Sequence, residues 1–569
     1  MSYADLVLLH APSVYDFRQK AILCGPVSDQ IPSSSVFEMY PIGFASIADY
    51  LERAGYRVRI ANLAVRMLNN RRFDAGAFIK RLRAPLFGVD LHWLVHAHGA
   101  VEVARLVKQH HPQSKVIFGG LSSSYFYREL MQYPEVDYVM RGDSTEEPLR
   151  QLMVCLKERM EPASVPNLVW RDSRGTVREN PFSHVPADLG GVMVSHYTNV
   201  VRSVLRYRDL VSYTPFGNWK EYPITAAFTC RGCTESCVIC GGSAAAYRQF
   251  YNRDRVAFRS PEAVVKDVRQ IGRFSRGPIF ILGDLRQAGD DYAYQVLNLL
   301  RSSRMKNQFV LELFNPAPTE LIRQMGLSCP RFCLEISPES HDPKVRRAAG
   351  RHYSSEDLEQ TLGDALDAGC GRLDVFFMIG LPRQTPQSVM DNVDYCEYLL
   401  QKFEGDKRLS LFLAPLSPFL DPASLGFEEP ERHGYHVLFR TLEEHRQALL
   451  SPSWKYSLNY ETDWLTRHQI VEITYEAMLR LVRLKARYGN IPQKLAEAGE
   501  KRLQAAWEMT HRLDELLADG SLEEQLPHLK PKLDEINAYP ASDRVELQLP
   551  VGWLKIRPWR ALWSLLTGR

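Results

Sequence analysis

Four cysteines gather in one short loop of this chain. They follow an apolar run that begins at Ile224, and they are Cys230, Cys233, Cys237 and Cys240. Thiolates this close together favour zinc or an iron–sulfur cluster, and the inner spacing C-x-x-x-C-x-x-C fits three corners of a four-iron cubane. Three ligands for four irons leave one iron open to a substrate or cofactor, by the logic that separates catalytic from structural zinc sites.

Two other interpretations of the loop stay open. With Cys230 as a fourth ligand, the spacing becomes C-x-x-C-x-x-x-C-x-x-C, which would make a closed, structural zinc site. Redox-active thiols or a chance grouping are the second alternative. We leave Cys230 off the ligand list, because a fourth thiolate on a cubane would fill the open position.

Length and composition limit the classes of protein to consider. A chain of 569 residues predicts two or three domains, each with its own core. The formal net charge of +3 gives no field that would attract nucleic acid. Ten cysteines, four of them in one loop, do not form a secreted disulfide framework, and no signal sequence or apolar run of membrane-spanning length is visible. We therefore expect a cytoplasmic protein.

Short apolar runs alternate with helix-length segments on both sides of the cysteine loop. Residues 1–160 contain five predicted strands with helices between them, which predicts an α/β doubly wound parallel sheet of the Rossmann-like type. Residues 161–222 read as a linker with a small hairpin. Residues 223–427 contain six further strands with helices between them, and residues 428–569 read as a helical region with an amphipathic tail.

The segment 223–427 resembles the partial (β/α)6 TIM barrel of the radical S-adenosylmethionine (SAM) superfamily. In that family a C-x-x-x-C-x-x-C loop holds a [4Fe-4S] cluster and SAM binds the fourth iron, which implies Cys233, Cys237 and Cys240 as ligands. The resemblance also implies SAM contacts at strand ends, namely Gly283, Asp284, Glu339, Ser340 and Gly380. For the acidic positions the alternative is a solvated charge or a loop cap, and Arg346, Arg347 and Arg351 are expected to face solvent.

The first segment is similar to the cobalamin-binding domain that precedes the barrel in one class of radical SAM enzymes. The pattern VIFGGLSS, followed by DYVMRGDSTEEPL, carries this likeness. It implies cobalamin contacts in loops at the ends of strands, at Asp90, His92, Gly119, Gly120, Leu121, Ser122, Gly142 and Asp143. The D-x-H-x-x-G motif that brings a histidine to cobalt is absent after the first strand, so we expect no histidine on the metal, with His92 as the exception to examine.

The two resemblances together imply a cobalamin-dependent radical SAM enzyme. Such enzymes use a 5'-deoxyadenosyl radical on an unactivated carbon, and methylcobalamin then supplies a methyl group. We expect a methyltransferase with a small-molecule or lipid-like substrate and an external one-electron donor of the flavodoxin or ferredoxin type. Two alternatives stay open: cyclisation, rearrangement or carbon–carbon coupling without methyl transfer, and a non-catalytic cobalamin- or metal-binding sensor.

The last residues differ from the rest of the predicted helical region. Three tryptophans alternate with basic residues, and Trp559, Leu562, Trp563 and Leu566 share one helical face. Aromatic and cationic side chains together suit the interface of a membrane. The tail is therefore a candidate for peripheral membrane contact, and the alternative is a tail that packs on its own protein.

Overall fold

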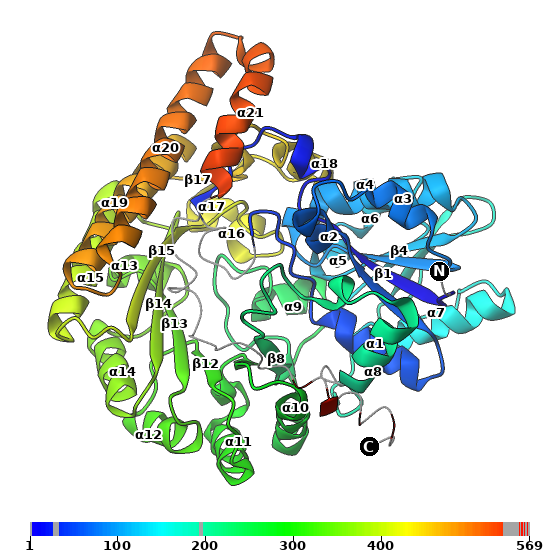
Figure 1. Ribbon diagram of the computed structural model, residues 1–569, viewed down its shortest axis with the longest axis horizontal. Helices are drawn as coiled ribbons and strands as arrows, with labels where there is room; N and C mark the ends of the chain where they lie inside the picture. Colours follow the sequence, from blue (N-terminus) through cyan, green and yellow to red (C-terminus); the bar gives the residue numbers. More distant parts are fainter. Residues whose placement is uncertain are drawn as a thin grey trace.

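The computed structural model describes residues 3–26, 34–192 and 197–538, together with Arg557, Trp559, Arg560, Trp563 and Leu566. Two sheets lie side by side, and the C-terminal helices pack against the second of them (Figure 1). The tail positions Trp553, Lys555, Leu562 and Arg569 lie outside the described residues. Within the described ranges, no helix is both long enough and apolar enough to cross a bilayer.

The first sheet confirms the predicted Rossmann-like fold. Its first five strands are parallel in the order β2-β1-β3-β4-β5. They are β1 (Leu6–His10), β2 (Val58–Asn62), β3 (Leu86–Asp90), β4 (Lys115–Gly119) and β5 (Tyr138–Met140). Helices cover both faces, because the apolar sides of α1 (Gly43–Arg53) and α7 (Glu146–Glu158) pack on one face and those of α3 (Ala75–Lys80) and α4 (Ala97–His110) pack on the other.

The predicted hairpin extends this sheet. Strands β6 (Leu168–Arg171) and β7 (Val177–Glu179) pair antiparallel beyond β5. Leu168, Val169 and Trp170 are buried, and the Trp170 indole donates a hydrogen bond to Asn180 at 3.0 Å. The hairpin therefore belongs physically to the first sheet, where its apolar residues are removed from water.

The second sheet confirms the predicted partial barrel. Six parallel strands follow the order β15-β14-β13-β12-β11-β8. They are β8 (Thr225–Phe228), β11 (Ile279–Leu282), β12 (Phe309–Leu313), β13 (Cys333–Glu339), β14 (Arg372–Ile379) and β15 (Leu409–Pro415). The helices between them form the outer layer in Figure 1, and they include α10 (Pro261–Phe274), α11 (Asp290–Ser303), α12 (Thr319–Ser328), α14 (Ser355–Asp367) and α15 (Pro386–Lys402).

The two faces of the barrel strands have different chemistry. Outward side chains such as Leu311 and Leu313 join the large core beneath the helices. On the other face, strand register places Glu312 beside Glu335 and Glu335 beside Asp374. This alternation is what a strand with one packed face and one polar face produces. The polar face is available to bind a ligand rather than to complete the core.

The C-terminal region closes the open edge of the barrel. Helices α18 (Leu442–Ala448), α19 (Arg467–Arg487), α20 (Gln493–Ala518) and α21 (Leu522–Ala538) confirm the predicted helical character. Helix α19 packs on α15 and β15, so it covers the last strand (Figure 1). A two-stranded antiparallel sheet, β16 (Tyr435–Val437) with β17 (Tyr460–Thr462), was not predicted, and its Tyr435 hydroxyl donates to the Gly380 carbonyl after β14.

Candidate cluster and cofactor sites

The cysteine loop starts at the carboxyl end of β8, the edge at which barrel enzymes place their active sites. Cys230 and Arg231 form the short strand β9 (Cys230–Arg231), and the loop ends at α9 (Ala244–Phe250), which Ser243 caps. Within the loop, the Val238 amide donates to the Ala349 carbonyl at 3.1 Å, and the Gly426 amide donates to the Val238 carbonyl at 2.8 Å. These bonds fix the loop against both the barrel and the C-terminal region.

The three predicted cluster ligands are half-buried thiols. Backbone amides donate to two of them, Glu235 to Cys233 at 3.4 Å and Gly242 to Cys240 at 3.3 Å. Burial raises the pKa of Cys233 to about 11 and also raises the pKa values of Cys237 and Cys240. The thiols therefore hold their protons until a metal displaces them, and loading of the loop becomes more favourable as pH rises.

The three thiols are the donors that a cubane would take, as the spacing of the loop predicts. Among the described residues, no group of three or more His, Cys, Asp or Glu side chains converges as one metal ion requires. A cubane instead takes each thiolate at a different corner, and amide donors to sulfur tune such clusters. Cys230 is engaged elsewhere, since its thiol lies 3.7 Å from the Gln287 amide nitrogen and 3.8 Å from the Gly232 carbonyl. The assignment of the three ligands stays a prediction that this geometry supports.

Gly283 and Asp284 lie at the end of β11, as expected, but the Asp284 carboxylate already has partners. It accepts from the Arg286 guanidinium at 2.6 Å and from the Phe314 amide at 3.0 Å. A neighbouring carboxylate, Glu312, accepts from the Gly283 amide at 3.0 Å. Glu312 is therefore a second carboxyl group at the same strand ends, and burial raises its pKa. Sequence reasoning missed Glu312, although a glutamate inside the apolar strand FVLEL was a visible signal.

Glu339, Ser340 and Gly380 have three different surroundings. Glu339 has a φ of 66° and pairs with Arg351 at 3.3 Å, while its Oε2 atom is buried without a hydrogen-bond partner in the described part of the chain. The Ser340 hydroxyl bonds to Asn392. Gly380 packs on Tyr460, whose hydroxyl would lie 2.0 Å from an added Cβ. Glu339 therefore offers an unused acceptor for a ligand hydroxyl or ammonium, and all three assignments stay predictions.

The expectation that the three arginines face solvent is wrong for two of them. Arg346 and Arg351 are buried, at 0% and 7% exposure, and only Arg347 is exposed. Arg351 is held inside by Glu339 and by the Phe314 carbonyl, to which it donates at 2.8 Å. A buried charge is expensive unless it is paired, so the strand-end carboxylate explains the position of this guanidinium.

The predicted cobalamin loops lie at the carboxyl edge of the first sheet. A Cβ at Gly120 would lie 2.6 to 2.8 Å from backbone atoms of Leu91 and His92, and the Ser122 hydroxyl donates to the His92 carbonyl at 3.0 Å. The loops after β3 and β4 are thus locked together. A Cβ at Gly119 would meet open space, so the edge leaves room for a flat ligand. Leu121 packs against a small core formed by Ala246, Tyr251 and Ala423.

The loop after β3, which contains three histidines, begins at a buried carboxylate and carries an exposed aromatic side chain. Asp90 is held by His10, with Nδ1 to Oδ1 at 3.0 Å, so its carboxylate serves the fold beneath the loop. Burial lowers the pKa of His92, which keeps the imidazole neutral near pH 7. Trp93 is 43% exposed beside it and was missed by sequence reasoning. Neutral His92 and flat Trp93 are both compatible with a corrin ring over this edge.

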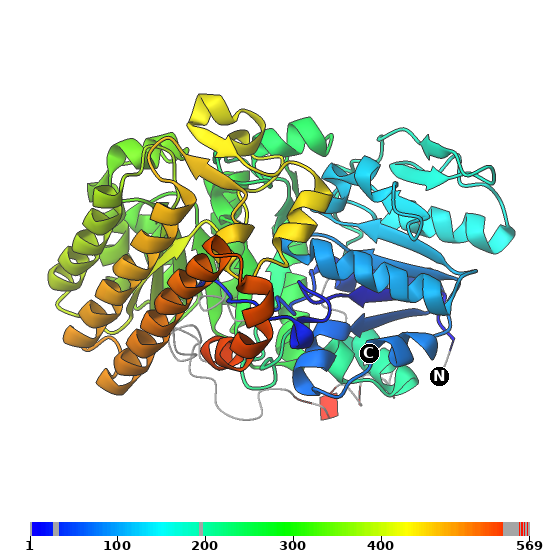
Figure 2. The same ribbon diagram turned by 90° about the horizontal axis from the view of Figure 1, so that it is seen from above.

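Gly142 and Asp143 connect the two cofactor segments. The Asp143 carboxylate accepts from the Arg253 guanidinium at 2.5 and 2.9 Å, and the two side chains are only 7% and 2% exposed. Arg253 also lies against Gly232 of the cysteine loop. A second pair joins Glu146, just after β5, to Arg231 of β9 at 2.9 Å. These contacts hold the carboxyl edge of the first sheet against the cysteine loop of the barrel. Figure 2 shows the two domains side by side from above.

Replacing Arg253 by methionine is expected to lower the free energy of unfolding by about 3 to 5 kcal/mol, because Asp143 would be left as an unpaired buried charge. Thermal unfolding of Arg253→Met should show this as a lower Tm. The double variant Arg253→Met/Asp143→Leu should recover much of the loss, since it removes both charges. A single variant as stable as the unmodified protein would mean that the pair does not hold the two segments together.

Comparison with known proteins agrees with this architecture. A B12 binding domain model matches residues 32–151, and a radical SAM superfamily model matches residues 228–396. The chain is 22% identical to hopanoid C-3 methylase of Methylococcus capsulatus over 358 residues, which cover 60% of this chain and 62% of that protein. It is also 22% identical to cytidylyl-2-hydroxyethylphosphonate methyltransferase of Streptomyces wedmorensis over 256 residues, covering 39% and 47% of the two chains. The chain thus spans less than two thirds of the length of each of these relatives.

Solved structures share the fold. The radical SAM methyltransferase TsrM from Kitasatospora setae superposes with a TM-score of 0.58 at 16% identity, covering 84% of this chain and 89% of that one. The cobalamin-dependent SAM radical enzyme OxsB superposes with a TM-score of 0.51 at 13% identity, covering 100% and 83%. Each family match covers one of the two segments that the ion pairs join. The chain therefore belongs to the radical SAM proteins that carry an N-terminal cobalamin-binding domain, with a [4Fe-4S] cluster, SAM and cobalamin as their cofactors.

Proposed function

We propose that this protein is a methyltransferase that places a methyl group on an unactivated carbon of a small molecule. The observation that carries the proposal is the pair of contacts Asp143–Arg253 and Glu146–Arg231, which fixes the cobalamin loops against the cysteine loop. Two cofactors bound at these edges would face one shared space. The names of the two curated relatives, a methylase and a methyltransferase, support the same class of reaction.

When bound, the three cofactors supply one-electron cleavage of SAM, hydrogen abstraction and a transferable methyl group. The chain would supply position and exclusion of water. Cys233, Cys237 and Cys240 would hold the metal as thiolates after losing their protons. Glu339 Oε2 would accept a hydrogen bond from a SAM hydroxyl or ammonium, and Arg351 keeps that carboxylate oriented.

At the other edge, the backbone contacts between Gly120 and His92 would keep a flat surface for the corrin. The neutral His92 imidazole would contact the ring without adding charge. Helix α19 covers the last barrel strand and limits entry of water from that side. An external one-electron donor would supply the electron that reduces the cluster, because each reductive cleavage of SAM consumes one electron.

Anaerobic incubation with SAM and dithionite tests the proposal. A methyltransferase should form 5'-deoxyadenosine and S-adenosylhomocysteine together, and the product should carry one additional methyl group. A product without added methyl, formed with 5'-deoxyadenosine alone, would favour cyclisation, rearrangement or coupling. Release of neither nucleoside product would leave only the sensor interpretation.

We further propose that the C-terminal tail contacts a membrane surface, which favours a lipid-like substrate. Trp559, Trp563 and Leu566 are 80%, 68% and 83% exposed, and their spacing places them on one face of a helix. Arg557 and Arg560 lie beside them and suit anionic headgroups.

The double variant Trp559→Ser/Trp563→Ser should therefore co-sediment with phosphatidylglycerol vesicles about tenfold less than the unmodified protein, because it removes two interfacial aromatic side chains. Leu205→Ser/Leu517→Ser is the matched control, since both leucines are exposed elsewhere on the surface. Equal sedimentation of all three proteins would remove the membrane proposal and leave the methyltransferase proposal untouched.

A further inference from the structure

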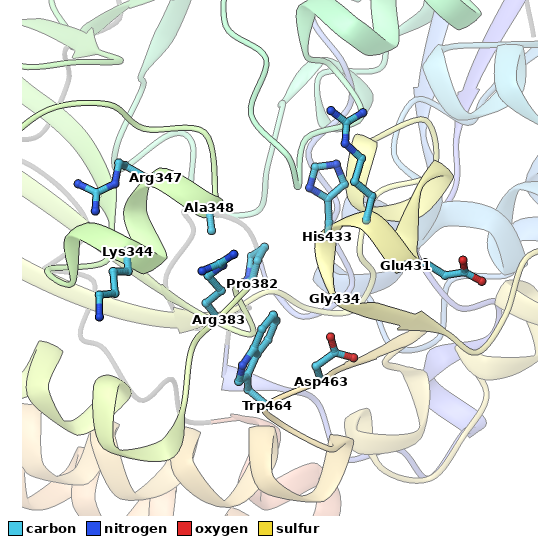
Figure 3. A pocket seen from close by; sticks show the side chains of 11 residues that line it. Lys344, Arg347, Ala348, Pro382, Arg383, Glu431, His433, Gly434, Asp463 and Trp464 are labelled. Atoms are coloured by element: carbon cyan, nitrogen blue, oxygen red, sulfur yellow. The ribbon is translucent and has the colours of Figure 1, made fainter.

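A cavity of about 520 Å³ lies beside the cysteine loop and is not used by the site described above. Its walls come from α13 (Pro343–Ala348), the loop after β14, α17 (Pro430–His433) and the loop after β17. Figure 3 shows Arg383 and Trp464 on one side of the cavity and His433 on the other. The walls thus combine the barrel with the C-terminal region.

The lining is rich in cations that lack partners. Lys344, Arg347 and Arg383 are exposed, and none of them has a carboxylate within ion-pair distance among the described residues. Of the other charged groups at the rim, Arg432 pairs with Glu429 at 2.8 Å and Asp463 contacts His436 at 2.8 Å, while Glu431 is an exposed carboxylate on the α17 wall. The lining thus carries four cationic side chains, Lys344, Arg347, Arg383 and Arg432, against the two carboxylates of Glu431 and Asp463. A ligand with negative charge would complement this excess of positive charge.

Arg383 is presented by a rigid loop. Its φ of 64° lies in the left-handed region, which non-glycine residues adopt only when their surroundings hold them there. The next side chain, Gln384, is fully buried, and its Oε1 accepts from the amides of Gly380 and Leu381 while its Nε2 donates to the Met378 carbonyl. The loop is fixed from inside, so the guanidinium stays at the cavity.

Both walls of the cavity are bonded to one residue of the cysteine loop. Val238 lies between the predicted ligands Cys237 and Cys240; its amide donates to Ala349, the residue that follows α13. Its carbonyl accepts from Gly426 in α16 (Leu425–Glu428), which leads directly into α17. The cationic cavity is therefore adjacent to the cluster site and reaches the surface of the protein.

We propose that this cationic cavity is the docking surface for an acidic protein that delivers single electrons, an inference that rests on the proposed function. One electron would leave the reduced donor and enter the cluster, and no bond would form or break at the contact. Weak electron-transfer complexes use small interfaces, and opposite charges raise their association rates.

The exposure of the lining favours a protein over a small ligand. Lys344, Arg347, Arg383, Glu431, Arg432 and Asp463 are all exposed. Sites for small molecules bury most of the ligand, about 70 to 90% of its surface. A ligand in this cavity would stay in contact with water, whereas acidic side chains of a protein partner would be covered by the rest of the interface.

The test compares two charge reversals of equal size in the full-length protein. Lys344→Glu/Arg347→Glu changes the cavity, and Arg301→Glu/Lys306→Glu changes two exposed basic residues next to β12, at the opposite end of the barrel strands. Oxidised flavodoxin, an acidic one-electron donor protein, is titrated onto each at low and high salt. We expect the cavity variant to bind at least about tenfold more weakly and with less salt dependence, and the control to bind as the unmodified protein does.

Turnover gives a second readout. SAM cleavage driven by dithionite should be equal in all three proteins, because a small reductant needs no docking surface, whereas cleavage driven by reduced flavodoxin should fall only in the cavity variant. Unchanged flavodoxin binding by the cavity variant would overturn the docking proposal, and so would an equal loss with dithionite, which would instead place a substrate in the cavity. Absence of dithionite-driven cleavage in the unmodified protein would contradict the proposed function itself.

Discussion

Replacement of Cys237 by alanine is expected to remove most of the iron from anaerobically reconstituted protein and to reduce formation of 5'-deoxyadenosine to background. Mutation of groups that only orient metal ligands already costs about 10- to 100-fold in metal affinity or activity, so loss of a ligand should cost more. Cys237 lies against Gly350 in the middle of the loop, and no other described thiol stands in its place. Iron content and nucleoside product are the measurements.

Cys230→Ala is the matched control for this experiment. Its thiol contacts Gln287 and Gly232, so we expect it not to be a ligand, and iron content and SAM cleavage should stay within about twofold of the unmodified protein. If Cys230→Ala lost as much iron as Cys237→Ala, four thiolates would hold the metal. The open position that the account needs for SAM would then not exist.

Replacement of Gly120 by valine is expected to abolish retention of cobalamin while the cluster is kept. Any Cβ at this position meets the backbone of Leu91 and His92, and backbone cannot move aside as a flexible side chain can. The φ of 117° adds strain for a residue other than glycine. The loops after β3 and β4 would therefore separate and lose their shared surface for the corrin.

Absorbance of cobalamin after gel filtration measures this loss, and iron content in the same sample reports the cluster. Gly43→Val is a suitable control, because Gly43 has ordinary helical surroundings and nothing within 4 Å of an added Cβ. Cobalamin retained by Gly120→Val in the amount found for the control would place the corrin elsewhere on the protein.

Elements with strong local signals were predictable from the sequence. The five parallel strands of the first sheet and the six of the barrel are apolar runs separated by periodic helices, and β1 is a buried strand of this kind. The cysteine loop was equally visible, since its residues are adjacent in sequence. Capping residues such as Ser260 and Thr385 mark helix starts that the alternation already implied.

Contacts between distant residues were not predictable in the same way. Nothing near Asp143 in the sequence indicates that its partner is Arg253, 110 positions away. The burial of Arg351 depends on Glu339 and on the Phe314 carbonyl, which reach it only once the barrel forms. Gly380 looked like a cofactor glycine, yet its nearest neighbour is Tyr460 of the unpredicted small sheet.

The central claim is a four-iron cluster held by three cysteines with one iron open to SAM. Mössbauer spectroscopy of the protein reconstituted with ⁵⁷Fe tests it most directly, before and after addition of SAM. The account predicts that one iron of the four changes its isomer shift when SAM is added and that the other three do not. A spectrum in which SAM changes no iron site, or a reconstituted protein that contains zinc in place of iron, would contradict it.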